Sequence, residues 1–151
     1  MDKYDKIIFI CNGNTSRSPM AETIYRSLET NQELAVTSRG LVVLFPEPPN
    51  PKAVIVMNNH NLSVEEHTAS QLTEEDFDEH TILLTMSEKQ KNKVLDEFGE
   101  MENVSTLKEF IGEAGDVTEP FGGSLIEYEN CYVELATLIK KLVYKLNQEE
   151  L

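Results

Sequence analysis

The segment 6–11, Lys-Ile-Ile-Phe-Ile-Cys, constrains the fold of this chain more than any other feature of its sequence. A continuous apolar run of this length is typical of a parallel strand that is buried on both faces. Turn-forming residues follow at 12–16, and a helix is then predicted from Pro19 to about Thr30, with Ser18 as its N-cap. A buried strand, a turn and a helix in this order predict the first unit of an α/β fold.

The same alternation continues along the chain. Further strands are predicted at 33–38, 81–86 and 104–107, and further helices at 52–58, 88–98 and 124–146. The β-branched residues of 52–58 also fit a strand, but Pro51 suits the first position of a helix, and we expect a helix.

The last predicted helix has apolar residues at every third or fourth position, which predict one buried stripe. These residues are Leu125, Tyr128, Tyr132, Leu135, Ile139, Leu142 and Leu146. The whole order predicts a parallel sheet with helices on both faces. In such sheets the ligand binds beyond the carboxyl ends of the strands, where residues 11–18 fall.

The composition indicates one domain over residues 1–151. Hydrophobic residues make up 40% of the chain and charged residues 26%, and no repeat or long linker divides it. The Pro-rich stretch 45–51 is expected to be a stiff surface loop. No apolar run approaches the roughly 20 residues of a membrane span, and the N-terminus shows no export signal, so we expect a cytoplasmic protein. The net charge of −14 argues against binding to nucleic acid or to an anionic membrane.

The chain has two cysteines, Cys11 and Cys131, which are too few for a disulfide framework. Its three histidines have no spacing to them that is typical of a metal site, so we expect neither a metal nor a cofactor. A cysteine that ends a buried strand in a reducing compartment is a candidate nucleophile, and this describes Cys11. Cys131 falls on the last predicted helix, where packing is the simpler interpretation.

Residues 11–18 combine the features that hold a phosphoryl group above a thiolate. The turn-forming residues 12–14 favour backbone N–H groups that point inward, and the start of the following helix adds unpaired donors. Arg17 adds a planar fork of donors that can bind two phosphate oxygens. The same donors favour the ionised form of Cys11, which could then attack phosphorus. Cys-x5-Arg alone also occurs by chance around a structural cysteine, but the strand before it and the Ser-Pro helix start after it favour catalysis.

The sequence Cys-Asn-Gly-Asn-Thr-Ser-Arg-Ser-Pro-Met-Ala-Glu at 11–22 resembles the signature of the low-molecular-weight protein tyrosine phosphatase family. The resemblance extends to Ser-Arg-Gly at 38–40, His-Thr-Ala-Ser-Gln-Leu at 67–72 and Thr-Glu-Pro-Phe-Gly-Gly-Ser at 118–124, and so covers most of the chain. It implies a four-stranded parallel sheet flanked by helices, with the phosphate loop at the carboxyl end of the first strand. It also implies hydrolysis of phosphorylated proteins through a phosphocysteine intermediate on Cys11.

The resemblance also implies roles for individual residues. The general acid of the family is an aspartate before a proline, and here the matching residue is Glu119, before Pro120. Because its stem is one methylene longer, we expect it to act as general acid and base less effectively than an aspartate, with Asp116 as the second candidate. The residues expected to bind phosphate beside Arg17 are Asn12, Gly13, Asn14, Thr15, Ser16 and Ser18, and those expected to support the loop by hydrogen bonds are Asn14, Ser18, Ser38 and His67.

The substrate that the resemblance implies is phosphoarginine or phosphotyrosine. Phosphotyrosine enzymes of the family usually have an apolar residue at the position of Thr15 and a slot walled by Trp or Tyr, whereas this chain has no Trp. Thr15 and the Phe-Gly-Gly-Ser run at 121–124 resemble the protein arginine phosphatase branch, which puts phosphoarginine slightly ahead. Phe121 and Phe45 are the candidate walls, although each would also suit core packing. Arg39 replaces the usual small residue, and no role is assigned to it.

The altered acid also motivates an alternative function. A chain of this fold with a poorly placed acid could be a phosphate-binding or phosphopeptide-binding module that turns over weakly.

Overall fold

The structure is a computed structural model in which residues 4–28, 33–120 and 122–149 are described. Its strands are β1 (Lys6–Cys11), β2 (Ala35–Gly40), β3 (Thr81–Thr85) and β4 (Val104–Thr106). Its helices are α1 (Arg17–Ser27), α2 (Pro51–Asn59), α3 (Glu88–Phe98), α4 (Leu107–Phe110) and α5 (Leu125–Glu149), with a short 3-10 helix η1 (Glu74–Asp76) before β3.

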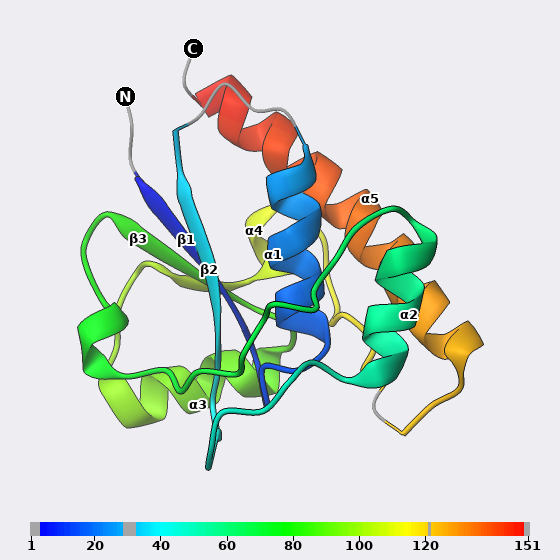
Figure 1. Cartoon of the computed structure of the whole chain (residues 1–151). Coiled ribbons are helices and arrows are strands. Elements are labelled where there is room, and N and C mark those ends of the chain that lie inside the picture. The colour runs from blue at the N-terminus through cyan, green and yellow to red at the C-terminus, as the bar shows by residue number, and fades with distance from the viewer. Residues whose placement is uncertain (1–3, 29–32, 121, 150–151) are drawn as a thin grey trace.

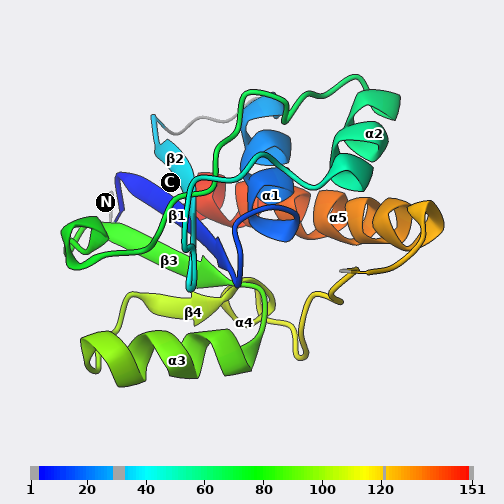
Figure 2. The same cartoon turned by 60° about the horizontal axis from the view of Figure 1, so that its bottom comes forward.

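The four strands form one parallel sheet in the order β2-β1-β3-β4, so β1 is an interior strand. α1, α2 and α5 cover one face of the sheet and α3 covers the other (Figures 1 and 2). The predicted fold class is therefore confirmed. The chain leaves β1 for β2 on one side and later forms β3 on the other side, and such a change of direction leaves a crevice at the carboxyl end of the first strand. Cys11 lies at this end, paired with Gly40.

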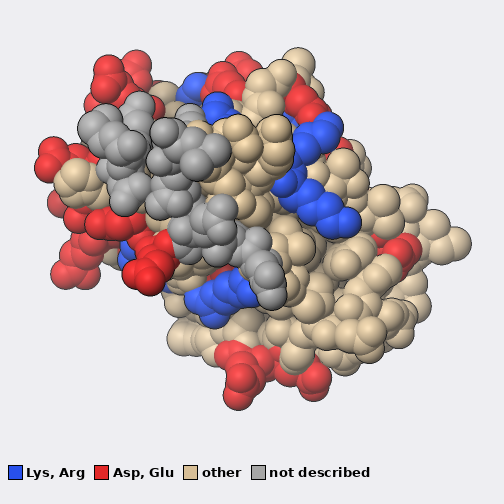
Figure 3. Space-filling view, turned by 90° about the horizontal axis from the view of Figure 1, so that it is seen from above, with Lys and Arg blue, Asp and Glu red and all other residues tan. Residues whose placement is uncertain are grey.

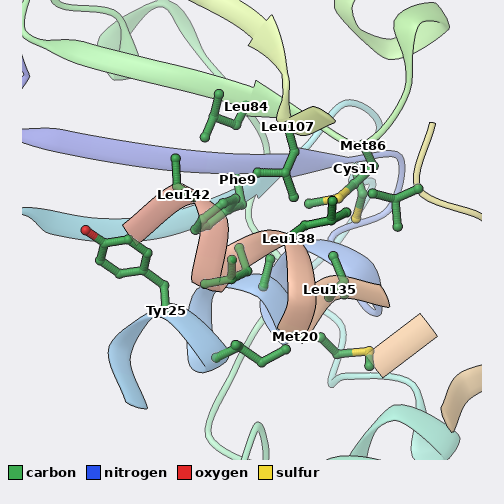
Figure 4. Close-up of a cluster of buried hydrophobic side chains, with 14 of the residues drawn as sticks. Phe9, Cys11, Met20, Tyr25, Leu84, Met86, Leu107, Leu135, Leu138 and Leu142 are labelled. Carbon is green, nitrogen blue, oxygen red and sulfur yellow. The ribbon is translucent and has the colours of Figure 1, made fainter. Parts of the chain in front are cut away.

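The side chains of β1 alternate between two hydrophobic clusters because successive residues of a strand face opposite sides of the sheet. Phe9 and Cys11 belong to the larger cluster, with α1, α2 and α5, whereas Ile8 and Ile10 belong to a smaller cluster against α3. Figure 4 shows Cys11 at one end of the larger cluster, beside Met86. Close packing on this side fixes the backbone that carries the cysteine.

The first helix begins earlier than predicted. α1 starts at Arg17 rather than Pro19, and its N-cap position is Ser16, whose side chain makes no capping hydrogen bond. Pro19 still lies in the first turn, where its missing N–H would have had no helical partner. Ser18 lies inside this turn, and its hydroxyl contacts Cys11. The prediction of Ser18 as the N-cap was wrong because the site, and not the helix end, uses this hydroxyl.

The ambiguous segment at 52–58 is helical. Pro51 is the first residue of α2, and the Oδ1 of Asn50 caps the helix by accepting a hydrogen bond from the N–H of Lys52 at 2.9 Å. β2 begins and ends later than predicted and runs to Gly40, while α4 and η1 were not predicted.

The stripe predicted on α5 is buried or partly buried from Tyr128 onward. Leu125, however, is 45% exposed, so its assignment to the buried stripe was wrong. It is the first residue of α5, and the neighbouring Ile126 is exposed too, which shows that the helix begins outside the core.

The acidic side chains are distributed in groups over the surface. Figure 3 shows the face at the amino-terminal end of the sheet, where groups of acidic side chains surround a smaller number of basic ones.

Among the described residues, no helix has both the length and the apolar composition that a membrane span requires.

Candidate active site

The floor of the candidate site is the segment 11–18. It consists of the end of β1, the loop 12–16, which we call the phosphate loop, and the first turn of α1. Cys11 ends β1, and its Sγ lies 2.8 Å from the Oγ of Ser18 in the first turn of α1. Asn14, Arg17 and Ser18 are all buried, and none is more than 4% exposed. The structure thus brings the predicted nucleophile and the residues of the following loop together at the carboxyl end of β1.

Asn14 is the centre of the hydrogen bonds that hold this loop. Its φ of 59° lies in the left-handed region, which Asn tolerates better than most residues. Its Nδ2 donates to the hydroxyls of Ser18 at 2.8 Å and Ser38 at 3.0 Å, and its Oδ1 accepts from the N–H of Ser70 at 2.9 Å. Because the Ser18 hydroxyl accepts from Asn14, its own proton is free to be donated to the sulfur of Cys11. Such a bond is strongest when the sulfur is a thiolate.

A second group of side chains holds this network from behind. The hydroxyl of Ser38 donates to the Oε1 of Glu22 at 2.7 Å, and the Oε2 of Glu22 pairs with Arg26 at 2.8 Å. The Nε2 of His67 lies 2.7 Å from the carbonyl oxygen of Asn14, and since a carbonyl can only accept, this nitrogen carries the proton. Ser38 and His67 therefore contact the loop in the manner that the resemblance implies.

Glu22 is a supporting residue that the sequence analysis missed. It lies four residues after Ser18 and four before Arg26. Residues at this spacing share one face of a helix, so the position of Glu22 was a usable signal.

The backbone N–H groups of residues 12–18 make no hydrogen bond within the described parts of the chain. The carbonyl oxygens of Cys11, Asn12 and Thr15, by contrast, accept hydrogen bonds from the loop that follows β2. Unpaired amides next to the amino end of a helix are the arrangement that binds an oxyanion.

Arg17 joins this floor to the segment that carries the predicted acid. Its Nη1 donates to the carbonyl oxygen of Val117 at 2.9 Å, and its Nη2 donates to the Oε1 of Glu119 at 3.2 Å. Val117 is itself attached to the end of β3, since its N–H donates to the carbonyl of Met86 at 2.8 Å. The guanidinium has further N–H groups with which it can bind a phosphoryl group.

The two candidate acids are placed differently. Glu119 lines the same cleft as Cys11, and its side chain is 50% exposed. The Oδ1 of Asp116 accepts a hydrogen bond from the N–H of Glu88 at 3.0 Å, at the start of α3, and Asp116 does not line the cleft. The geometry favours Glu119 as the acid.

The described residues that line the cleft come from the phosphate loop, the loop after β2 and the segment at 119–120. They are Cys11, Asn12, Gly13, Thr15, Ser16, Arg17, Val42, Glu47, Pro48, Pro49, Asn50, Pro51, Glu119 and Pro120. Phe45, a predicted wall, lies on the loop after β2 but outside this lining, and it is 62% exposed. Phe121, the other predicted wall, lies outside the described residues.

Gly40 allows β2 to approach the phosphate loop. A Cβ at this position would lie 2.6 Å from the side chain of Val43, 3.0 Å from the Cβ of Asn14 and 3.1 Å from the carbonyl oxygen of Asn12. The Cβ of Asn14 and the carbonyl oxygen of Asn12 belong to the phosphate loop, so only glycine at position 40 fits without moving this loop.

Cys131 and Arg39 lie outside the cleft lining. Burial raises the pKa of the Cys131 thiol to about 12, which fits a packed, protonated side chain. Arg39 pairs with Asp76 at 3.3 Å and donates to the hydroxyl of Thr37 at 3.0 Å, so it connects β2 to η1.

No group of His, Cys, Asp and Glu side chains suited to hold a metal ion is found among the described residues.

Comparison of the chain with known proteins identifies its family. The family model described as low molecular weight phosphotyrosine protein phosphatase matches residues 6–151. A protein-arginine-phosphatase of Bacillus subtilis is 36% identical over an alignment of 148 residues, and the match covers 95% of this chain and 97% of the relative. The low molecular weight protein-tyrosine-phosphatase PtpB of Staphylococcus aureus is 37% identical over 137 residues, which are 91% of this chain and 96% of the relative.

A solved structure shows the same arrangement of the chain. It is a cysteine-to-serine mutant of the YwlE arginine phosphatase with a phosphorylated active-site serine. Its TM-score is 0.84 at 35% identity, and the match covers 93% of this chain and 95% of that one. These matches define the class as protein phosphatases that depend on a cysteine. The chain belongs to the low molecular weight phosphotyrosine protein phosphatase family.

Proposed function

We propose that this protein removes phosphate from the arginine side chains of other proteins through a phosphocysteine intermediate on Cys11. The observation that carries the proposal is the cluster on the cleft floor. The Sγ of Cys11 lies 2.8 Å from the hydroxyl of Ser18, and Arg17 contacts Glu119 at 3.2 Å.

In the first step, the thiolate of Cys11 attacks phosphorus, so that an S–P bond forms while the bond from phosphorus to the leaving nitrogen breaks. The amides of residues 12–18 and the guanidinium of Arg17 stabilise the charge on the phosphoryl oxygens. The carboxyl group of Glu119 gives its proton to the leaving nitrogen, so the leaving group is an unmodified arginine side chain.

In the second step, water attacks the phosphorus of phosphocysteine. The Glu119 carboxylate now takes a proton from this water, the S–P bond breaks, and inorganic phosphate and the Cys11 thiolate are released. Thr15 lines the cleft, and in this proposal its hydroxyl orients the attacking water.

Two features favour phosphoarginine over phosphotyrosine. Thr15 gives the slot a polar side chain, and none of the described residues that line the cleft is aromatic. A phenol ring would gain less from such walls, since stacking on an aromatic side chain is a large part of its binding energy. Overall similarity does not separate the substrates, because relatives named for arginine and for tyrosine dephosphorylation are about equally identical to this chain.

The proposal is tested with phosphoarginine and phosphotyrosine peptides of the same flanking sequence, hydrolysed side by side, with Cys11→Ser as the blank. We expect kcat/KM for the phosphoarginine peptide to be higher by at least about tenfold, a difference of about 1.4 kcal/mol. Thr15→Ile should shift this ratio toward phosphotyrosine. Hydrolysis of phosphotyrosine alone would contradict the substrate, and an unchanged ratio in Thr15→Ile would remove Thr15 from the argument.

The longer acid side chain favours a second candidate, a phosphate-binding module that turns over weakly. Half of the Glu119 side chain is exposed, and its one described ion pair is with Arg17. Binding of p-nitrophenyl phosphate without release of phosphate would support the module. Release that Cys11→Ser abolishes would exclude it.

A further inference from the structure

The loop from Leu41 to Asn50, which we call the β2–α2 loop, is attached directly to the phosphate loop. The N–H of Leu41 donates to the carbonyl of Cys11 at 3.1 Å, and the N–H of Asn50 donates to the carbonyl of Thr15 at 2.9 Å. Figure 1 shows it passing the start of α1 on its way from β2 to α2. Because both of its ends are bonded to the cleft floor, its backbone is held beside the candidate reacting groups.

Glu47 lies at the stiffest part of this loop. Pro46 precedes it and Pro48 and Pro49 follow it, so the backbone around it has little freedom. Its carbonyl accepts a hydrogen bond from the N–H of Ala69 at 2.9 Å. The residue is exposed and lines the cleft, so its side chain extends from a backbone that is held at the cleft wall.

The carboxylate of Glu47 has no partner in the described parts of the chain, since it takes part in none of the ion pairs or side-chain hydrogen bonds found there. The nearest basic residue in sequence, Lys52, donates instead to the carbonyl of Gly123 at 2.5 Å. An unpaired carboxylate beside a phosphate site repels an incoming phosphoryl dianion. It is useful there only if the substrate also brings a cation.

Phosphoarginine brings such a cation. Its guanidino group is positively charged and is bonded directly to the phosphoryl group, and the arginine released after cleavage carries the same charge. Phosphotyrosine has an uncharged ring at the corresponding place. A carboxylate accepts two parallel N–H bonds from a guanidinium, which fixes the plane of the leaving group as well as its position.

We propose that Glu47 is the residue that binds the guanidinium of the substrate and thereby selects phosphoarginine, an inference that rests on the function proposed above. In this arrangement Cys11 forms the S–P bond, the P–N bond breaks, and the proton of Glu119 goes to the leaving nitrogen. Glu47 keeps its charge throughout and holds the guanidinium before and after cleavage.

A contact that is present in both the bound substrate and the transition state changes KM and leaves kcat nearly unchanged. We therefore expect Glu47→Gln to raise KM for a phosphoarginine peptide about tenfold, with kcat within about twofold of wild type. For the matched phosphotyrosine peptide, KM should stay the same or fall, because a repulsive charge is removed. Glu47→Asp should restore part of the phosphoarginine KM.

The matched control is Glu97→Gln, which removes the same charge from an exposed position near the C-terminal end of α3. This end of α3 lies toward the amino-terminal ends of the strands, away from the cleft (Figure 2). It should leave both KM values within about twofold of wild type, since charges beyond a Debye length are largely screened. A second measurement uses N-acetylarginine amide as a competitive inhibitor of p-nitrophenyl phosphate hydrolysis. Its inhibition constant should rise about tenfold in Glu47→Gln and stay unchanged in Glu97→Gln.

The two levels of the proposal fail in different ways. Wild-type protein that cleaves p-nitrophenyl phosphate but no phosphoarginine peptide overturns both the arginine substrate and the role of Glu47. Wild-type protein that cleaves phosphoarginine with a KM that Glu47→Gln does not change overturns the role of Glu47 alone. An equal rise of KM for both peptides also overturns it, because a general disturbance of the cleft would not discriminate between them.

Discussion

The floor and the walls of the cleft are built in different ways. On the floor, Asn14 and Ser18 are fully buried and their side chains bond to other polar groups. On the walls, Glu47 and Glu119 are exposed; Glu119 pairs with Arg17, and Glu47 takes part in no ion pair found among the described residues. The fold therefore holds the floor with its own hydrogen bonds, whereas the exposed wall carboxylates have one ion pair, that of Glu119 with Arg17, among the described residues. In the function proposed above, the floor supplies the nucleophile and the oxyanion donors, whereas the walls supply the proton, through Glu119, and select the side chain that carries the phosphate, through Glu47. This difference predicts that wall substitutions change activity alone, while floor substitutions change activity and stability together.

The largest effect is expected at the wall residue Glu119. Glu119→Gln keeps the shape but cannot donate or take a proton, so kcat for a phosphoarginine peptide should fall about 100- to 1000-fold, with a smaller loss for p-nitrophenyl phosphate, whose leaving group needs less protonation. Steady-state kinetics on both substrates measure this. The melting temperature should remain within about 2 °C of wild type because the side chain is half exposed. A larger loss in Asp116→Asn than in Glu119→Gln would identify Asp116 as the acid and break the comparison.

The next effect is expected at Asn14, on the floor, with Asn61 as a matched control. Both residues have a left-handed backbone, with φ of 59° and 63°, but Asn61 is exposed and holds no such network. Asn14→Ala should lower the free energy of unfolding by about 3 kcal/mol, because it removes one hydrogen bond from each of the hydroxyls of Ser18 and Ser38 and leaves the N–H of Ser70 without its partner. Asn61→Ala should lower it by about 1 kcal/mol.

Asn14→Ala should also reduce kcat/KM about 10- to 100-fold, since the loop loses its support. Urea unfolding and p-nitrophenyl phosphate hydrolysis measure the two quantities. Equal losses of stability in the two variants would show that the strained backbone alone, and not the network, is responsible.

A smaller effect concerns Cys131, which shares the larger hydrophobic cluster with Cys11 but does not open onto the cleft. Its pKa is raised to about 12 by burial, so the folded chain keeps a proton that the unfolded chain loses near pH 9. The stability that this thiol contributes is therefore complete below pH 9 and is lost as pH rises from about 9 to about 12.

Between pH 8.5 and 10.5 the free energy of unfolding should decline about 2 kcal/mol more in wild-type protein than in Cys131→Ala. Chemical unfolding at several pH values measures this. In the folded protein at pH 8, iodoacetamide should label Cys11 and leave Cys131 free, as read by mass spectrometry of the peptides. Rapid labelling of Cys131 would contradict the assignment of this thiol to the core.

The smallest effect is expected for a carboxylate that, unlike Glu47, has a lysine partner. A hydrogen bond from Lys91 holds the pKa of Glu109 below its usual range, so the pair stabilises the fold at neutral pH and this contribution is lost as pH falls through the lowered pKa. Because the pair is exposed and screened, Lys91→Met should lower the free energy of unfolding at pH 7 by no more than about 0.5 kcal/mol. The difference should shrink as pH falls through the lowered pKa of Glu109, and also in about 0.5 M salt. A difference that does not shrink with falling pH would show that Lys91 acts through packing.

The parts of the structure that the sequence predicted well are those with local signals. Ser87 and Gln90 form a capping box at the start of α3, and Gly99 ends it with a φ of 99°, so both ends of that helix could be predicted from short-range chemistry. The same holds for Pro51 at the start of α2. The apolar run of β1 and the spacing of Cys11 and Arg17 likewise fixed the place of the floor.

The parts that the sequence did not predict depend on contacts between distant segments. The sequence around Ser18 predicts a helix cap, and only the contact with Cys11 in the folded chain shows its other use. The need for glycine at position 40 follows only from the approach of β2 to the phosphate loop. Glu22 and Glu47 are two of many acidic residues in a chain of net charge −14. Their positions in the support network and on the cleft wall arise only when α1 and the β2–α2 loop pack against β1.

The bonds made by Asn14 have a consequence for the protein at work in the cell. Since they hold in shape the loop that is proposed to bind the phosphoryl oxygens, the inorganic phosphate released by the proposed reaction would meet the same donors as the next phosphoprotein. Free phosphate would then act as a competitive inhibitor, and the rate of dephosphorylation would fall as its concentration rises above its inhibition constant.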